Sequence, residues 1–203
     1  MDFFAAYSRH AAATGLPLDR REILAVWYEL LVKWNRRINL TRVDAPEDAV
    51  AYHLADCVPL ARSLASGETL LDIGSGAGVP GLIVAALRED VTVVCAESTA
   101  KKAAFLTQAA QAMKLPNVRV HHGRAEQMTE RFDTITARAV AKPGELAQRF
   151  GHLLIEGGKL AVFAAEKTGA TPPPGWRQLN EISYDLPAGH GARSLFIFVT
   201  AKK

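Results

Sequence analysis

Three closely spaced glycines follow an apolar run and precede a helical pattern, in the sequence Leu70-Leu71-Asp72-Ile73-Gly74-Ser75-Gly76-Ala77-Gly78-Val79-Pro80-Gly81. Glycines lack a Cβ atom, so a ligand can approach the backbone of this turn closely. A dinucleotide-binding turn has the spacing G-x-G-x-x-G, whereas the third glycine here is at position 78 and position 79 is Val79. Asp72 suits a ligand with a cationic amino-acid group better than a pyrophosphate. The turn therefore predicts a small-molecule site, with a purely structural tight turn as the alternative.

A second acidic residue, Glu97, ends the next apolar run, 23 residues beyond Gly74. A carboxylate at this place accepts hydrogen bonds from ribose hydroxyls, both in NAD sites and in S-adenosylmethionine sites. Alternatively, Glu97 or Ser98 caps the helix that is expected to begin near residue 99. Further on, the backbone N–H of Ala125 and the carboxylate of Glu126 could read an adenine edge, or Glu126 could simply belong to the first turn of a short helix.

Short β-rich runs alternate with helical patterns from residue 69 onward. The predicted strands are Thr69–Ile73, Thr92–Ala96, Val118–His121, Phe132–Ala137, Lys159–Ala165, Gln178–Tyr184 and Ser194–Thr200, and the helices fall near 79–88, 99–114, 124–129 and 143–154. This alternation predicts a mostly parallel sheet whose ligand loops lie at the carboxyl ends of the strands. The last two strands are joined by a short loop, which allows only a hairpin. We therefore expect five parallel strands and an antiparallel pair at one edge.

The segment before this sheet is helical in pattern. Residues 3–13, 20–37 and 46–64 carry apolar side chains at helical spacing. They predict an N-terminal helical cap over residues 1–66, packed on a Rossmann-like domain over residues 67–203.

Composition excludes several classes of protein. The 203 residues are 49% hydrophobic and 22% charged, with a formal net charge of +3. No apolar run reaches the roughly 20 residues that span a membrane, and the N-terminus does not resemble a signal peptide. The two cysteines fit no metal or redox motif, so we expect no metal site and a cytoplasmic location.

One local cluster of positive charge stands beside Trp34. Lys33, Arg36, Arg37 and Arg42 occur without an intervening acid. They predict either contacts with RNA phosphates or a solvated helix end.

These motifs resemble the ribosomal small-subunit methyltransferase G family, also called glucose-inhibited division protein B, over nearly the whole chain. The resemblance is carried by Asn35–Thr41, His53–Asp56, Asp72–Gly81, Glu97-Ser98, Lys101-Lys102, Phe105-Leu106, Asn117-Val118, Arg138-Ala139 and Arg193. The Asn-Leu-Thr segment together with Gly-Val-Pro-Gly is far more specific than the glycine turn alone. The chain departs from the family pattern at Cys57, where serine is typical, and at Lys167-Thr168-Gly169, where Lys-Gly is common.

The resemblance implies a class I S-adenosylmethionine-dependent methyltransferase (Rossmann-like) fold, with a mostly parallel seven-stranded sheet and an antiparallel edge strand. It implies methyl transfer from S-adenosylmethionine to N7 of one guanine in small-subunit (16S) ribosomal RNA, free or in the assembled small subunit, by a protein that we expect to be a monomer. The expected cofactor contacts are Asp72, Gly74, Gly76, Gly78, Val79, Glu97, Ser98, Ala125, Glu126 and Arg138. The substrate-side candidates are Asn39, His53, Asp56, Arg138, Lys167 and Arg193.

An N7 target agrees with the absence of any recognisable catalytic-base motif in the sequence. Guanine N7 has an exposed lone pair and no proton to remove, so transfer needs chiefly alignment and a dry site. His53 and Asp56 are three residues apart on a predicted helix and share a face, either as a substrate-side pair or as a structural hydrogen bond.

Three other functions stay open at the level of sequence. The first is a class I methyltransferase acting on another RNA, a protein or a small molecule. The second is a dinucleotide-dependent oxidoreductase, against which the glycine spacing argues. The third is an inactive RNA-binding module with the same fold.

Overall fold

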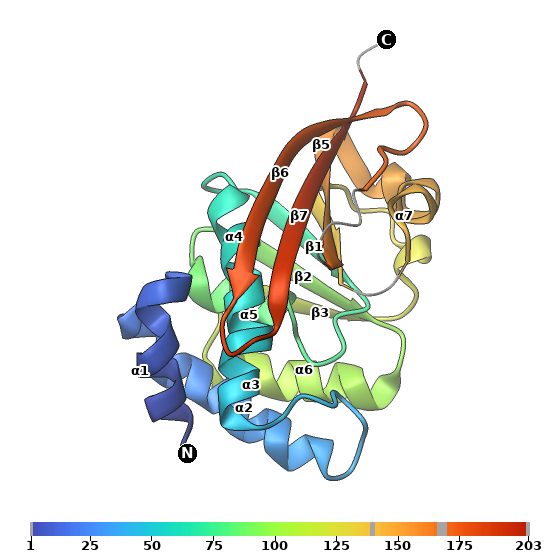
Figure 1. The fold of residues 1–203 in the computed structure, drawn as a ribbon. Coiled ribbons are helices and arrows are strands. Elements are labelled where there is room, and N and C mark those ends of the chain that lie inside the picture. The colour runs from blue at the N-terminus through green and yellow to red at the C-terminus, as the bar shows by residue number, and fades with distance from the viewer. Residues whose placement is uncertain (1, 139–140, 166–169, 202–203) are drawn as a thin grey trace.

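A seven-stranded sheet forms the centre of the computed structural model, which describes residues 2–138, 141–165 and 170–201 (Figure 1). Its strands are β1 (Thr69–Ile73), β2 (Thr92–Glu97), β3 (Val118–His122), β4 (Phe132–Ala137), β5 (Leu154–Ala165), β6 (Trp176–Leu186) and β7 (Gly191–Thr200). The strand order is β3-β2-β1-β4-β5-β7-β6. Strands β1 to β5 pair in parallel, whereas β7 pairs antiparallel with both β5 and β6. The predicted fold class is confirmed.

The hairpin of β6 and β7 is longer than its sequence suggested. Pairing extends from Trp176 opposite Thr200 to Leu186 opposite Gly191, so that only the turn at residues 187–190 joins the strands. The predicted strand ends at Tyr184 and Ser194 are therefore wrong, because Gly191, Ala192 and Arg193 carry no β-rich pattern but pair in the ladder. In Figure 1 the hairpin crosses the molecule as two long red strands.

The helices differ from the prediction mainly at their ends. They are α1 (Phe3–Thr14), η1 (Leu18–Arg20), α2 (Arg21–Asn35), α3 (Pro46–Asp48), η2 (Ala49–Leu54), α4 (Ala55–Ser63), α5 (Gly81–Leu87), α6 (Ala100–Ala112), η3 (Ala125–Gln127), α7 (Pro143–Phe150) and η4 (Gly151–Leu153). The helix predicted over 46–64 contains a π-helical segment, η2, a feature that often occurs at functional sites. The helix predicted over 124–129 is a single 3-10 turn. Nowhere in the described residues is a helix both long and apolar enough to cross a membrane.

Alternating side chains of the parallel strands enter two hydrophobic clusters, one on each face of the sheet. Leu70 and Val93 belong to the cluster that also contains residues of α1, α2, α4, α5 and α6, whereas Leu71 and Val94 belong to the other. The N-terminal helices thus share a hydrophobic cluster with the sheet. The boundary between residues 66 and 67 stays a prediction.

Candidate active site

The glycine turn leaves β1 at the carboxyl edge of the sheet and is held from two sides. The N–H groups of Gly74 and Ser75 donate to the Ala96 carbonyl of β2 at 2.9 and 3.2 Å. The indole N–H of Trp27, on α2, donates to the Ala77 carbonyl at 2.9 Å. The N-terminal helices therefore help to set the shape of this turn.

The three glycines of the turn have different physical roles. All three have left-handed backbone angles, with φ values of 68°, 51° and 78° for Gly74, Gly76 and Gly78. A Cβ on Gly76 would meet only the Gly74 carbonyl oxygen, at 3.7 Å, whereas a Cβ on Gly78 would lie 2.5 Å from Leu82 Cδ1. The expectation that Gly78 opens the turn to a ligand is therefore wrong, since Gly78 serves the close packing of α5. Val79 is also buried, which leaves Gly74 to Gly76 as the open part of the turn.

Glu97 links the glycine turn to the start of α6. Its carboxylate accepts from the Gly76 N–H at 3.1 Å through Oε2 and from the Thr99 N–H at 2.8 Å through Oε1. The side chain is buried at the end of β2. The N-cap of α6 is Thr99 and no side chain caps this helix, so the alternative in which Glu97 or Ser98 is the cap is wrong. The two hydrogen bonds leave lone pairs on both oxygens of Glu97 for ribose hydroxyls.

A cavity of about 340 Å³ opens beside this carboxylate, at the carboxyl ends of β1 and β2. Four predicted cofactor contacts line it together: Gly74, Ser98, Ala125 and Glu126. The remaining wall is Ile73, Ala96, Gly123, Arg124, Arg149 and Phe150. Glu97 itself does not line the cavity, although its chain neighbours Ala96 and Ser98 do. The wall offers apolar side chains and the polar groups of Glu126 and Arg149, which suits an adenosine moiety.

Two lining residues of this cavity, Arg149 and Phe150, escaped the sequence analysis. The Arg149 guanidinium donates to Glu126 at 2.6 Å, lies over the Phe150 ring at 4.9 Å, and holds the pKa of the Glu126 carboxyl below its usual range. Both residues belong to α7, which no motif connects with the glycine turn. The only signal in the sequence is that this helix follows the fourth strand of an open α/β sheet.

Asp72 is buried beneath the glycine turn and is only partly satisfied. Its Oδ2 accepts from the Gly81 N–H at 2.9 Å, whereas Oδ1 has no hydrogen-bond partner among the described residues. Burial raises the pKa of Asp72 from 3.8 to about 6. An unpartnered buried carboxylate oxygen is costly unless a ligand or a charge compensates it, which fits a cationic group bound nearby.

The raised pKa of Asp72 predicts a pH-dependent stability of the cofactor-free protein. Because folding favours the protonated acid, the stabilisation is fully present below the unfolded pKa and is lost as pH rises through about 6. A shift of this size corresponds to roughly 3 kcal/mol. We expect the unfolding free energy of the wild type, measured relative to Asp72→Asn, to fall between about pH 4 and pH 7. Denaturation curves whose difference does not change over this range would contradict the assignment.

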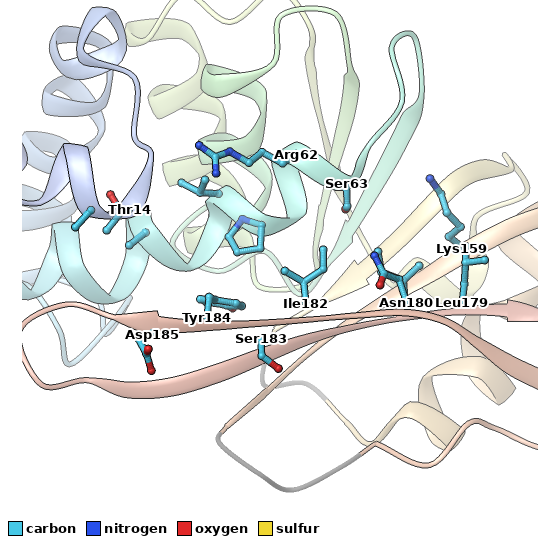
Figure 2. A pocket seen from close by; sticks show the side chains of 15 residues that line it. Thr14, Arg62, Ser63, Lys159, Leu179, Asn180, Ile182, Ser183, Tyr184 and Asp185 are labelled. Carbon is cyan, nitrogen blue, oxygen red and sulfur yellow. The ribbon is translucent and has the colours of Figure 1, made fainter.

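Arg138 binds three parts of the molecule together at the end of β4. Its Nε lies 2.9 Å from Asp56 Oδ2, Nη1 lies 3.0 Å from His53 Nδ1, and Nη2 donates to the Tyr52 carbonyl at 3.1 Å. Asp56 also accepts from the Tyr184 hydroxyl at 2.6 Å. In Figure 2, Tyr184 and Ile182 point from β6 toward α4, whereas Ser183 and Asp185 point away. The network thus joins β4, α4 and the hairpin.

His53 has no lone pair free for proton abstraction. Arginine can only donate, so Nδ1 of His53 accepts from Arg138 and the ring proton is on Nε2. That nitrogen lies 3.1 Å from the Val43 carbonyl, to which it donates. Burial and the adjacent Arg138 charge lower the pKa of His53 to about 3. The direct His53–Asp56 pair that we considered is wrong, because both side chains are buried and Arg138 contacts each of them.

Tyr52 is a further residue that the sequence analysis missed. The guanidinium carbons of Arg138 and Arg193 lie 4.7 and 5.0 Å from the centre of its ring, and His190 packs against it at 5.4 Å. The Arg193 backbone pairs in the ladders with Ala165 and Tyr184, and its guanidinium forms no hydrogen bond or ion pair with another described residue. The only signal for Tyr52 in the sequence is its position directly before His53, one of the substrate-side candidates.

The remaining substrate-side candidates are not brought into this network. Asn39 is exposed in the connection after α2. Lys167 lies outside the described residues. The basic cluster Lys33, Arg36, Arg37 and Arg42 is exposed along the same connection and the end of α2.

Two cavities of more than twice the volume of the cavity beside Glu97 lie elsewhere. One, of about 740 Å³, borders the start of α7 and the carboxyl half of β5, with Phe163 and residues 172–174 in its wall. The other, of about 800 Å³, lies between α4 and β6 (Figure 2). None of the predicted site residues that the structure describes lines either cavity.

The strand order, the glycine turn after β1 and the acid at the end of β2 together define the class I methyltransferase fold. A solved SAM-dependent methyltransferase from Aquifex aeolicus has a similar structure, with a TM-score of 0.58 and 15% identity over 79% of this chain and 97% of that protein. The model of the family described as rRNA small subunit methyltransferase G matches residues 20–170.

Two relatives, each named Ribosomal RNA small subunit methyltransferase G, match nearly the full length. The protein from Anaeromyxobacter dehalogenans (strain 2CP-1) is 34% identical over 206 residues, covering 95% of each chain. The protein from Xanthomonas campestris pv. campestris (strain B100) is 36% identical over 202 residues, covering 97% of this chain and 94% of the relative. The chain belongs to the rRNA small subunit methyltransferase G family, as its motifs predicted.

Proposed function

We propose that this protein transfers a methyl group from S-adenosylmethionine to N7 of a guanine in small-subunit ribosomal RNA. Membership of the family supports the substrate class. The observation that carries the chemistry is His53, whose two ring nitrogens are both engaged, by Arg138 and by the Val43 carbonyl. A free RNA or assembled-subunit substrate, a monomeric state and a cytoplasmic location stay predictions.

The cofactor site is proposed at the cavity beside Glu97. The open turn at Gly74 to Gly76 would admit the amino-acid part, Glu97 would hold the ribose, and Ala125 with Glu126 would contact the adenine. S-adenosylmethionine supplies an electrophilic sulfonium methyl group when it is bound. The partly satisfied carboxylate of Asp72 supports a cationic ligand above it.

The acceptor base is proposed in the cavity beside the start of α7 and the carboxyl half of β5, at the same edge of the sheet as the cofactor site. The cavity of about 740 Å³ walled by Phe163 and the proline-rich segment 172–174, with Lys142 and Glu145 also in its wall, has room for a purine. Arg193, presented by the Tyr52 ring, would contact the phosphate or the guanine edge. These groups orient the base and exclude water, which is what an alignment-controlled transfer requires.

The transfer itself needs no proton acceptor from the chain. Guanine N7 carries a free lone pair and no proton, so the residues of this chain would only have to hold and orient the base toward the methyl group that the bound cofactor would supply. His53 is neutral and both of its ring nitrogens are hydrogen-bonded, so it has no free lone pair with which to accept a proton. This agrees with a transfer in which no proton has to be removed from the base.

We expect the single-turnover methylation rate to be nearly constant from about pH 6.5 to pH 9 when RNA binding is saturated. His53, with a pKa of about 3, is neutral throughout that range. The variant His53→Ala is expected to lose rate through lost positioning of Arg138, without changing the shape of the profile. A wild-type rate that rises about tenfold per pH unit across neutrality, and that His53→Ala flattens, would indicate deprotonation and exclude N7.

A further inference from the structure

Two segments that contain no acidic residue meet on one side of the molecule. Residues 30–43 and 98–125 together carry nine Lys and Arg and no Asp or Glu, whereas the rest of the chain has fifteen Lys and Arg against twenty-one Asp and Glu. The first segment includes the end of α2, the second includes α6, and these helices pack together (Figure 1). The small net charge of the chain therefore hides a local excess of positive charge in these two segments, in which Arg119 is paired with Glu130.

A groove of about 470 Å³ lies where the two helices meet. It is lined by Lys33, Trp34, Arg37, Ile38, Lys101 and Gln108. The three cations are exposed, and none of them forms an ion pair with a described residue in the structure. Trp34 and Ile38 supply an apolar wall, so the groove combines a flat aromatic surface with a positively charged rim.

The orientation of Trp34 is fixed by neighbours on α6. Its indole N–H donates to Gln108 Oε1 at 2.8 Å, and its ring meets Phe105 edge-on at a centroid distance of 5.9 Å. Because the N–H is already paired, the ring itself is what this residue offers to a ligand. An aromatic surface beside cations suits an unstacked nucleobase and its phosphates, and stacking of this kind tolerates any base.

The groove lies next to the proposed cofactor site. Lys101 is in the first turn of α6, three residues after Ser98 of the proposed cofactor site, whereas the proposed acceptor cavity borders α7 and β5. A nucleotide in the groove would therefore be a different one from the methylated guanine.

We propose that the groove between α2 and α6 binds one unpaired nucleotide of the RNA substrate, with its base against Trp34 and its flanking phosphates on Lys33, Arg37 and Lys101. This proposal rests on the proposed function for the identity of the RNA. The RNA would then be held at two points, at the acceptor cavity through the target guanine and at the groove between α2 and α6 through a second nucleotide. Holding both points would fix the orientation of the guanine.

The test compares oligouridine of about ten nucleotides with an abasic ribose-phosphate chain of equal length, by fluorescence anisotropy at several salt concentrations. The triple variant Lys33→Gln, Arg37→Gln, Lys101→Gln is expected to flatten the log–log salt dependence by about two units. Trp34→Leu is expected to remove the preference for oligouridine over the abasic chain and to leave the salt slope unchanged. Gln108→Met, which frees the indole N–H but keeps the ring, retains the preference if Trp34 acts through stacking.

The matched control is Arg62→Gln with Arg131→Gln and Arg177→Gln, which removes the same charge outside both acid-free segments. An equal flattening of the slope by this control, or an unchanged oligouridine preference in folded Trp34→Leu, would overturn the proposal.

The groove variants are also assayed for methyl transfer to small ribosomal subunits, where a raised KM with unchanged kcat is expected. A wild type that methylates no RNA but shows the groove-dependent oligouridine preference would refute the proposed function alone. A wild type that methylates RNA and whose groove variants match the control would refute the groove alone.

Discussion

Glu97→Ala is expected to weaken S-adenosylmethionine binding by about 1.5–3 kcal/mol, the value of a hydrogen bond to a charged group. The carboxylate is the proposed ribose acceptor, and it also holds the N–H groups of Gly76 and Thr99. Its removal therefore takes away a ligand contact and loosens the turn that the ligand needs. Gly74→Ala is expected to act in the same direction, because a side chain at a φ of 68° is strained and Gly74 lines the proposed cofactor cavity.

Calorimetric titration with S-adenosylmethionine measures both effects directly. Glu97→Gln keeps an acceptor for one of the two N–H groups and should lose less affinity than Glu97→Ala. Glu29→Ala removes an exposed carboxylate from α2 and serves as the charge-matched control. Wild-type affinity in folded Glu97→Ala and Gly74→Ala would refute the cofactor site proposed at these residues.

Arg138→Ala is expected to lower the free energy of unfolding by about 3–5 kcal/mol, because it leaves a buried carboxylate without its counter-charge. Asp56 is fully buried, and its remaining partner is the Tyr184 hydroxyl. The same substitution leaves His53 Nδ1 and the Tyr52 carbonyl without their donors. One side chain therefore supports β4, α4 and the hairpin at once.

Urea denaturation of two further variants separates charge from packing. Asp56→Asn in the Arg138→Ala background removes the isolated charge but keeps an acceptor for Tyr184, so it should recover a large part of the lost stability. Arg138→Lys keeps the charge but loses the forked geometry that contacts three groups, and it should be intermediate. An Arg138→Ala protein within about 1 kcal/mol of wild type would mean that the buried carboxylate is compensated in another way.

The fold could be predicted from sequence because each of its signals is local. The β-rich runs of β1 to β5 alternate with helical segments, and the short link before Arg193 excludes a parallel crossover. The glycine turn and Glu97 could be assigned because both lie at strand ends, where open α/β sheets bind ligands. Gly78 was misread because its conformation serves packing against Leu82, a contact that spacing alone does not reveal.

The Arg138 network could not be predicted because it is made by long-range contacts. Tyr184 and Asp56 are 128 positions apart in the chain, and Arg138 and His53 are 85 apart. His53 lies in the π-helical segment before α4, and His53 and Asp56 each contact Arg138 and not one another. Arg149 was missed for the same reason, since it approaches Glu126 from a different helix.

The central claim is that this chain methylates N7 of a guanine in small-subunit ribosomal RNA. The direct test is incubation with S-adenosylmethionine labelled in its methyl group and small subunits that lack the modification, followed by reduction with borohydride and cleavage with aniline, which cuts RNA at N7-methylguanine. We predict label in the RNA and a single enzyme-dependent cut at a guanine, both lost in Glu97→Ala. Label in RNA that resists this cleavage, or label found only in protein, would contradict the claim.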